Sequence, residues 1–483
     1  HFLLKLGSVH TLCKSGNLKE VVFMNNSAAL SQFAVNLKYE DIPAEVIEMA
    51  KKMAIQTIGA ALASKEMDFT QSVLDFSKKY SSGPADATLM LDGRKTSLLG
   101  AVFANSIISD NIDWEDCSWT GHPSAGLVPA ALALAEARGK SGKDFLTAII
   151  AGFEVYQRIA MVIQPPRGFK ANIGWGLTSW QIFASCAPAA KMMDLTAEQY
   201  EQALGIAAVL MAVPNSLVHF TMSNIYHYQH GFCAQDGVLS AMLAEHGVDG
   251  MTGAFDGENG FGQHHLVSAQ EIEWYQKDLG TRYLIMDTLL KHWPTNMWVQ
   301  ASLDILDAFM KEDGITADDI DEIIVDPPTQ MRMTLRPEGY EKIIEAQYSI
   351  PYCIAALLLD PTPGAQWYTA ERMHDPELLA LASKVRPGPS DEQDLQVSFN
   401  TFQDGDFVDK TITVKCKDGR VLTRSCNYPK GHPKNQMTMD EVCERFRVQT
   451  RNALTPERAE EILDTLRNIE NMDDMSHIGE ILH

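Results

Sequence analysis

The chain has 483 residues, of which 45% are hydrophobic and 21% are charged, a balance that excludes a disordered or fibrous protein. Its formal net charge of −23 excludes a nucleic-acid-binding protein, because no basic stripe is present to neutralise phosphates. Its length exceeds the usual size of a single hydrophobic core, so we expect two domains.

The cysteines and the apolar stretches indicate the compartment. Eight cysteines are scattered without a C-x-x-C pair, which is typical of a reduced, cytoplasmic chain. Apolar stretches such as 125–135 and 205–214 are shorter than a membrane span of about 20 residues. We therefore expect a soluble cytoplasmic protein that contacts neither membrane nor nucleic acid.

Residues 1–23 carry no cleavable signal pattern, because Lys5 interrupts the apolar start and no small-residue cleavage site follows. We expect Met24 to be the natural start. Residues 1–27 are then an N-terminal extension or sequence added upstream.

Residues 28–286 have a helical period almost throughout. Apolar residues recur at intervals of three and four in the stretches 42–64, 141–163, 196–214 and 234–247. Thr196, followed by Glu198 and Gln199, has the pattern of a helix N-cap. Because these helices are apolar on every side, we expect several to lie buried in a bundle.

The pattern changes in residues 287–425, where 320–328, 394–402 and 410–426 alternate like strands. Asp418-Gly419 is a hairpin turn signal inside the third stretch. A helix is expected at 345–360. Together these elements predict a smaller α+β domain.

The helical period returns in residues 426–483, which we expect to rejoin the first domain. The fold class is therefore mainly α. A large all-helical domain is built from both chain ends, and a smaller α+β domain forms a lid.

Residues 110–136 place an acidic cluster and His122 directly before an apolar helix expected at 124–137. Asp113 and His122 are nine residues apart across a turn-forming segment. We interpret this as a loop that folds Asp113 toward His122, orienting the imidazole and raising its basicity. The alternative is a solvated loop whose histidine caps the helix.

Three further groups of residues are candidates for a site. His227 and His230 are spaced to share one helical face, but no third ligand stands at metal spacing, so we expect no metal there. Lys291 is positioned to bind a carboxylate as a point charge, unless it is an ordinary exposed lysine. Candidates for hydrogen bonds to an anion are Arg336, Ser349 and Tyr352, although a tyrosine on an apolar helix is more often part of the core. No dinucleotide-binding, P-loop or nucleophile-elbow motif stands in its required context, so no cofactor is expected.

Six motifs together resemble the MmgE/PrpD family in order and spacing. They are DNIDWEDCSWTGHPSAGLVPAALALAE with its continuation to Ile159, HGFCAQDG, GAFDGENGF, KHWP, AQYSIPYCIAALLLD and YPKGHPKNQMT. The resemblance covers residues 28 to 470.

The resemblance implies a homodimer with its active site in the cleft between a helical domain and a lid. Members of the family include 2-methylcitrate dehydratase, cis-aconitate decarboxylase and iminodisuccinate epimerase. They need no organic cofactor, and they carry out acid–base chemistry beside the carboxylates of a small di- or tricarboxylic acid.

Residue by residue, the resemblance assigns Asp113, His122 and Lys291 to family positions. Other family positions are changed: the second histidine is replaced within Gly174-Trp175-Gly176, the lysine by Tyr226, the threonine by Cys117, and later histidines by Asn296 and Gln300. These replacements leave the substrate, its stereochemistry and the reaction type open within the family.

We therefore expect a cofactor-independent lyase, a dehydratase or decarboxylase, acting on a small polycarboxylate. The expected catalytic residues are His122, oriented by Asp113, and Tyr226 as the proton donor, while Lys291 holds a substrate carboxylate. The further expected substrate-binding residues are Cys117, His227, His230, Asn296, Arg336, Ser349 and Tyr352. The alternatives are an epimerase or isomerase of a dicarboxylate, and a non-catalytic homologue that only binds a ligand.

Overall fold

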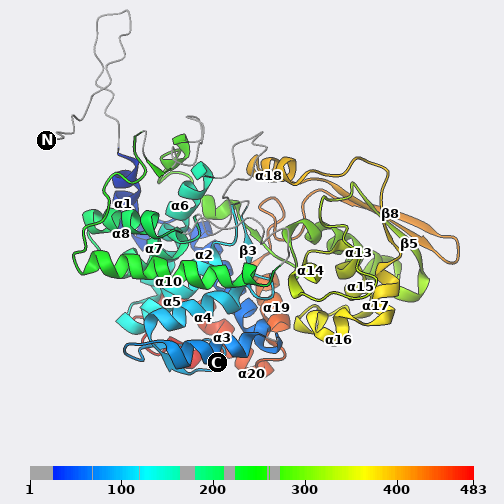
Figure 1. Cartoon of the computed structure of the whole chain (residues 1–483), viewed down its shortest axis with the longest axis horizontal. Coiled ribbons are helices and arrows are strands. Elements are labelled where there is room, and N and C mark those ends of the chain that lie inside the picture. The colour runs from blue at the N-terminus through cyan, green and yellow to red at the C-terminus, as the bar shows by residue number, and fades with distance from the viewer. Residues whose placement is uncertain are drawn as a thin grey trace, which may run out of the picture.

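The computed structural model of the chain describes residues 25–67, 69–118, 120–163, 180–211, 223–257, 260–261 and 272–482. Helices dominate, which confirms the expected mainly α class. Figure 1 shows two lobes, a larger helical one and a smaller one that carries a sheet.

The larger lobe contains helices from the N-terminal half of the chain and from its C-terminal end. They are α1 (Asn26–Asn36), α2 (Ala44–Ala63), α3 (Thr70–Tyr80), α4 (Leu98–Asp110), α5 (Ser124–Arg138), α6 (Gly142–Ile163), α7 (Phe183–Met192), α8 (Ala197–Leu210), α10 (Ile225–Glu245), α19 (Met439–Thr450), α20 (Pro456–Arg467) and α21 (Ile478–Ile481). Two short strand pairs accompany them, β1 (Ala87–Thr88) with β2 (Lys95–Thr96), and β3 (Asp116–Cys117) with β4 (Leu289–Leu290).

The smaller lobe combines one four-stranded sheet with short helices. Its helices are α13 (Gln300–Asp313), α14 (Ile343–Gln347), α15 (Ile350–Leu359), α16 (Ala370–Met373), α17 (Pro376–Ala382) and α18 (Leu395–Gln403). Its strands are β5 (Ile320–Asp326), β6 (Val385–Pro387), β7 (Lys410–Cys416) and β8 (Val421–Cys426), in the spatial order β6-β5-β7-β8.

Local sequence signals account for many of these boundaries. Thr196 forms a capping box with Gln199 at the start of α8, which confirms the expected N-cap. The hairpin β7–β8 turns at Asp418-Gly419, where Gly419 has a φ of +90°, and this confirms the turn signal. The helix expected at 345–360 is divided into α14 and α15, because Ser349 caps α15 and Pro351 lies in its first turn.

Two expectations about single segments were wrong. Residues 394–402 form helix α18 instead of a strand, because the Asp394 side chain accepts the backbone N–H of Val397 and caps a helix there. Apolar stretches do reach membrane-spanning length, since α6 is 22 residues long and apolar enough to cross a bilayer. Its apolar window is completely buried by the rest of the protein, which is the position of a core helix.

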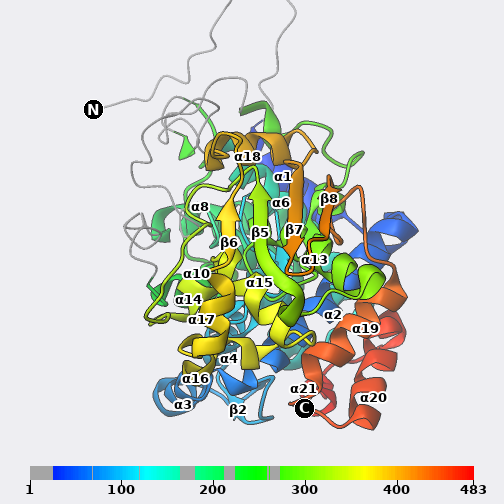
Figure 2. The ribbon, with the colours of Figure 1, turned by 90° about the vertical axis from the view of Figure 1, so that its right-hand side faces the viewer.

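Strands β5 and β7 form the centre of the sheet, and β7 alternates buried and half-exposed residues. Ile412 and Val414 face the core, and α13 and α15 pack on that side of the sheet. Figure 2 shows the sheet face-on with β6 beside β5. The sheet therefore has one buried and one solvent-facing side.

The C-terminal helices belong to the core of the larger lobe. Helix α19 packs along α2, and Phe446 and Val442 on α19 are completely buried. Ile462 on α20 is buried in the same cluster. Segments about 400 residues apart in the chain thus form one hydrophobic core.

Truncation of this contact should destabilise the protein. We expect Phe446→Ala to lower the free energy of unfolding by about 3–5 kcal/mol, because it removes a buried ring and leaves a cavity. The control is Phe76→Ala, which removes a ring that is 54% exposed and should cost about 1 kcal/mol or less. Urea unfolding followed by tryptophan fluorescence measures both, and equal small effects would contradict the assigned packing.

Candidate functional site

An ionisable cluster lies where the two lobes meet. Helix α4 ends at Asp110, and the chain turns sharply at Asp113, which has a φ of +57°. Strand β3 then pairs with β4, and Lys291 follows β4 directly. This pairing, with a hydrogen bond from Lys291 N to Glu115 O of 3.0 Å, places Lys291 beside the acidic segment.

Two glycines permit the close approaches that assemble the cluster. A Cβ at Gly231 on α10 would lie 2.6 Å from a side-chain carbon of Ile107 on α4, so α10 can cross α4 closely only with glycine there. A Cβ at Gly431, which has a φ of +91°, would lie 1.8 Å from the carbonyl oxygen of Leu290. The first glycine lets α10 approach α4 closely near Asp110, and the second lets residue 431 lie against Leu290, directly before Lys291.

The acidic segment is buried, so the alternative of a solvated loop is wrong. Asp110, Asp113, Glu115 and Asp116 are each 0% exposed. Asp116 accepts hydrogen bonds from Ser124 N and Thr288 Oγ1, both at 3.1 Å, and therefore caps α5. The capping role belongs to Asp116, which leaves the His122 side chain for other contacts.

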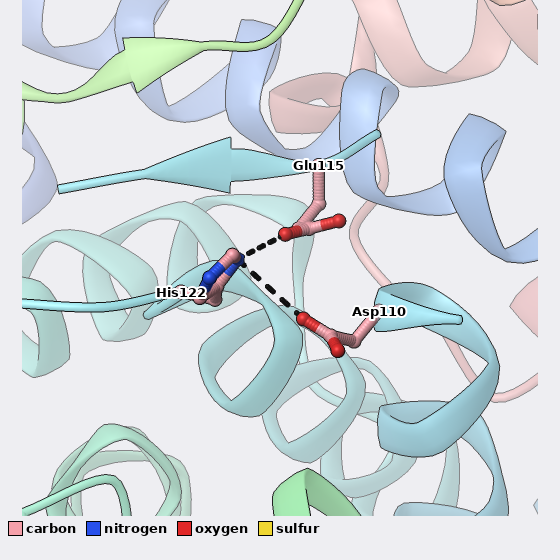
Figure 3. A group of neighbouring side chains, drawn as sticks. All are labelled: Asp110, Glu115 and His122. Atoms are coloured by element: carbon pink, nitrogen blue, oxygen red, sulfur yellow. Dashed lines mark hydrogen bonds and ion pairs between the residues drawn. The ribbon is translucent and has the colours of Figure 1, made fainter. Parts of the chain in front are cut away.

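His122 lies between carboxylates, as Figure 3 shows. Its Nδ1 hydrogen-bonds Glu115 Oε1, and it lies 3.5 Å from Asp110 Oδ1 and 4.0 Å from Asp113 Oδ1. The expectation that Asp113 orients His122 was therefore wrong: Glu115 makes the hydrogen bond, because the turn at Asp113 directs that carboxylate to Lys291. Burial raises the pKa of Glu115 well above its ordinary value.

The other nitrogen of His122 faces a hydroxyl. Tyr226 Oη on α10 lies 3.3 Å from His122 Nε2. In the neutral tautomer that donates Nδ1–H to the Glu115 carboxylate, Nε2 is the acceptor toward Tyr226. Burial, together with the charge of Lys291, lowers the pKa of His122, while burial raises that of Tyr226 well above 10.

Lys291 is the counter-ion of the cluster. Its Nζ contacts Asp113 Oδ1, lies 2.6 Å from Glu115 Oε1 and 3.1 Å from His122 Nδ1, and the side chain is 0% exposed. Burial alone would lower its pKa, but the two carboxylates outweigh burial and raise it well above its ordinary value. Protein carboxylates therefore already neutralise Lys291, and its expected role of holding a substrate carboxylate stays a prediction.

Asp110, Glu115 and His122 also have the spacing of a metal site, with candidate ligand atoms within 4.8 Å of one another. The ammonium of Lys291 stands beside Glu115 Oε1 and His122 Nδ1, two of the atoms that would bind such an ion. The ammonium of Lys291 therefore already occupies the position of a cation beside these ligand atoms.

His227 and His230 lie on one face of α10, as expected, and both approach Asp110. Gln347 Nε2 donates to Asn111 O at 3.0 Å, which orients the amide so that Gln347 Oε1 faces His227 Nε2 at 3.1 Å. His227 Nδ1 is 2.5 Å from Asp110 Oδ2, so both ring nitrogens face acceptors. Asp110 raises the pKa of His227 against the opposing effect of burial, whereas burial lowers that of His230 to about 4.

Some expected substrate-binding residues lie outside the cluster. Arg336 is largely exposed and pairs with Glu345 at 3.2 Å. Ser349 accepts the backbone N–H of Tyr352 at the start of α15, and the Tyr352 hydroxyl donates to Trp367 O inside the smaller lobe. These three residues stabilise the smaller lobe, and expecting them at an anion site was wrong.

The remaining expected positions divide between the cluster and its surroundings. Asn296 is buried beside Arg332, and its Oδ1 accepts a hydrogen bond from Arg332 Nε. Cys117 lies on β3 and is buried, with its Sγ 3.3 Å from Sδ of Met297 in the segment after β4. Gln300 Oε1 accepts two backbone N–H groups of the chain turn at 292–293. Gly174-Trp175-Gly176 lies outside the described residues.

Several residues of the cluster were not among the predicted site residues. They are Asp110, Glu115, Arg332, Gln347 and Tyr348. Asp110 and Glu115 were visible as part of the acidic segment, but the sequence offers no means of ranking four carboxylates before the turn at Asp113 is known. The other three come from the smaller lobe, where no local motif distinguishes them.

Removal of the buried ammonium tests the counter-ion role. We expect Lys291→Met to lower the free energy of unfolding by about 3–5 kcal/mol, because Asp113 and Glu115 lose their cation. The folded-state pKa of Glu115 lies above its ordinary 4.5, so stability falls as the pH rises above that value, and more steeply in the variant. Urea unfolding at about pH 5 and about pH 8 measures both effects.

The control for this experiment is Lys311→Met, which removes a 72% exposed lysine from an i,i+4 pair. It should change stability by about 0.5 kcal/mol or less. Equal effects of the two substitutions would contradict a buried counter-ion.

His227 should be doubly protonated at and below pH 6.5, since both of its nitrogens face acceptors and its pKa is raised above that value. Its contribution to stability is present below 6.5 and is lost as the pH rises through its folded-state pKa. Nitrogen-15 NMR of histidine-labelled protein, assigned with His227→Gln, should show two protonated ring nitrogens for His227 and one for His122. A neutral His227 below pH 6.5 would refute the assignment.

With the geometry established, comparisons with known proteins add the family. The model of the MmgE/PrpD N-terminal domain matches residues 28–273, and that of the MmgE/PrpD C-terminal domain matches residues 293–471. The first match contains His122 and Tyr226, and the smaller lobe lies within the second.

Similar proteins of assigned function share nearly the whole length of the chain. A cis-aconitate decarboxylase of Homo sapiens is 24% identical over 467 residues, which is 92% of each chain. A cis-aconitate decarboxylase of Aspergillus terreus is 23% identical over 482 residues, covering 95% of this chain and 96% of its own. Since the two family models together match well over half of the sequence, this chain belongs to the MmgE/PrpD family.

Proposed function

We propose that this enzyme of the lyase type decarboxylates a small tricarboxylic acid of the cis-aconitate class by acid–base catalysis at His122. The observation that carries the proposal is the environment of one buried imidazole. Its Nδ1 is held by Glu115, and its Nε2 faces the Tyr226 hydroxyl at 3.3 Å. The names of the relatives, which match over nine-tenths of the chain, support the substrate class.

The proposed reaction needs one proton and no external oxidant. The carbon–carbon bond to the departing carboxylate breaks, carbon dioxide leaves, and the electron pair moves into the adjacent double bond. That double bond shifts, and a proton adds at its far carbon. Protonated His122 is the acid for this step, and its lowered pKa makes the imidazolium a stronger proton donor.

Tyr226 has a separate role in this proposal. Its raised pKa keeps the hydroxyl protonated at neutral pH, so it donates a hydrogen bond instead of acting as a base. From 3.3 Å it orients Nε2 and the substrate atom placed there. Asp113 acts through Lys291, which it contacts directly.

A dicarboxylate epimerase is a weaker candidate. Epimerisation at one carbon requires proton transfer on two opposite faces. His122 Nε2 and the Tyr226 hydroxyl are only 3.3 Å apart, which is too close for a carbon atom to lie between them. The expected homodimer, the cytoplasmic location and the independence from cofactors and metals stay predictions of the sequence.

Turnover of cis-aconitate by the purified protein tests the proposal. We expect His122→Gln to lower kcat by about 10²–10⁴-fold, because the substitution removes the acid while keeping a polar side chain. Tyr226→Phe, which removes only the hydroxyl, should have a smaller effect. Carbon dioxide release and proton NMR of the product provide the measurement.

The control is His374→Gln, at an exposed histidine beside Glu341, which should retain wild-type turnover. The pH profile distinguishes the reaction types. If His122 donates the proton, kcat/KM rises as the pH falls below 6.5 toward its lowered pKa, whereas an elimination that uses it as a base becomes slower. Full activity of folded His122→Gln would refute the assignment.

A further inference from the structure

Arg332 is a buried cation on the smaller-lobe side of the cluster. It is 7% exposed, and in the chain it stands in the segment that connects β5 to α14. Its Nε donates to Asn296 Oδ1 at 2.9 Å, and the guanidinium lies over the Tyr348 ring, 4.5 Å from the centroid. These two contacts hold the guanidinium in one orientation.

In the described part of the chain, Arg332 has neither a counter-ion nor a full set of hydrogen bonds, whereas Lys410, a buried cation that also lacks a carboxylate, has three hydrogen-bond acceptors. Among the described residues, no carboxylate lies within the 4.0 Å ion-pair distance of its guanidinium, whereas Lys291 has two and Arg158 pairs with Glu154 at 3.0 Å. A buried charge without a partner is costly, because it has lost its hydration without compensation. Apart from the Nε bond, the described residues offer the guanidinium only a long contact from Nη1 to Met331 O at 3.4 Å, so they leave most of its five N–H donors without an acceptor.

Two tyrosines connect the guanidinium to the proposed acid. The Tyr348 ring beneath it packs against the Tyr226 ring, with centroids 6.0 Å apart, and Tyr226 reaches His122 Nε2. Asp113, Tyr226 and Tyr348 all act electrostatically on Arg332, although burial is the larger influence and lowers its pKa. Arg332 and Nε2 of His122 therefore lie at opposite ends of one short path through two tyrosines.

We propose that Arg332, positioned by Asn296 and Tyr348, binds one carboxylate of the substrate, and that the product retains this carboxylate. A planar guanidinium pairs with a carboxylate through two parallel hydrogen bonds, and this pairing supplies the missing counter-ion. The inference rests on the proposed function and assigns to Arg332 the role expected of Lys291, because Asp113 and Glu115 already pair with that lysine.

The chemistry of the reaction explains why the bound carboxylate is the retained one. The departing carboxylate must give up its negative charge to the carbon skeleton and leave as neutral carbon dioxide. A bidentate ion pair stabilises that charge where it is and would oppose the step. Arg332 therefore anchors a different carboxylate, and it leaves the reacting one near His122.

Binding of tricarballylate, a saturated tricarboxylate that cannot undergo the double-bond shift, tests the assignment by titration calorimetry. We expect Arg332→Gln to weaken its binding by at least about 30-fold, because a buried charge pair is lost. The same variant should raise KM for cis-aconitate more than it lowers kcat. Arg332→Lys keeps the charge without the planar fork and should show an intermediate loss, and it serves as the test if Arg332→Gln does not fold.

Arg336→Gln is the matched control, since Arg336 is largely exposed and pairs with Glu345. It should bind tricarballylate with wild-type affinity. Unchanged affinity in folded Arg332→Gln or Arg332→Lys, beside a wild-type protein that binds, overturns the role of Arg332 alone. A wild-type protein that neither binds tricarballylate nor converts cis-aconitate overturns the proposed function, and this inference with it.

Discussion

The ammonium of Lys291 lies among buried acidic side chains, and the arrangement of the whole cluster follows from it. Asp113 and Glu115 are completely removed from water, a state that costs several kcal/mol for each ionised group unless a cation compensates. Lys291 supplies that cation from the position directly after β4, the strand that pairs with β3. The pairing of β3 with β4 therefore also brings Lys291 to the carboxylates of Asp113 and Glu115.

The same electrostatics determine the state of His122. Burial and the nearby ammonium favour the neutral imidazole, while Glu115 holds its Nδ1. A histidine between a carboxylate and a lysine can accept or release one proton with little rearrangement around it. His227, only a short distance away on α10, has the opposite character, because Asp110 and Gln347 face both of its nitrogens. Two histidines of one cluster thus have different roles, which their partners assign.

The two lobes contribute different functions to the site. The helical lobe and β4 supply the groups that handle protons, namely Glu115, His122, Tyr226 and Lys291. The smaller lobe supplies Gln347, which orients His227, and Arg332, a cation that has no carboxylate partner among the described residues. A tyrosine from each lobe, Tyr226 and Tyr348, joins these two sets. Relative movement of the lobes would separate the proton donor from the proposed anchor for a carboxylate.

The sequence by itself determined the helical class, because helical periodicity is a local property of the chain. Its six motifs indicated the family, and the resemblance to that family predicted that His122, Tyr226, Asp113 and Lys291 belong to one site. The sequence also indicated the capping box at Thr196 and the hairpin at Asp418-Gly419, where a few adjacent residues decide the backbone. It did not predict helix α18, in which an N-cap at Asp394 outweighs an alternating pattern.

Only the tertiary structure decided which carboxylate serves which cation. Asp113 and Glu115 are two residues apart and chemically alike. Asp113, at a positive φ, contacts Lys291 directly and lies 4.0 Å from His122 Nδ1, whereas Glu115 hydrogen-bonds both Lys291 and His122. The same holds for Arg332 and Arg336, four residues apart: one is buried beside Tyr348, and the other is exposed beside Glu345. Burial and pairing depend on groups that are distant in the chain, and these contacts exist only once the chain has folded.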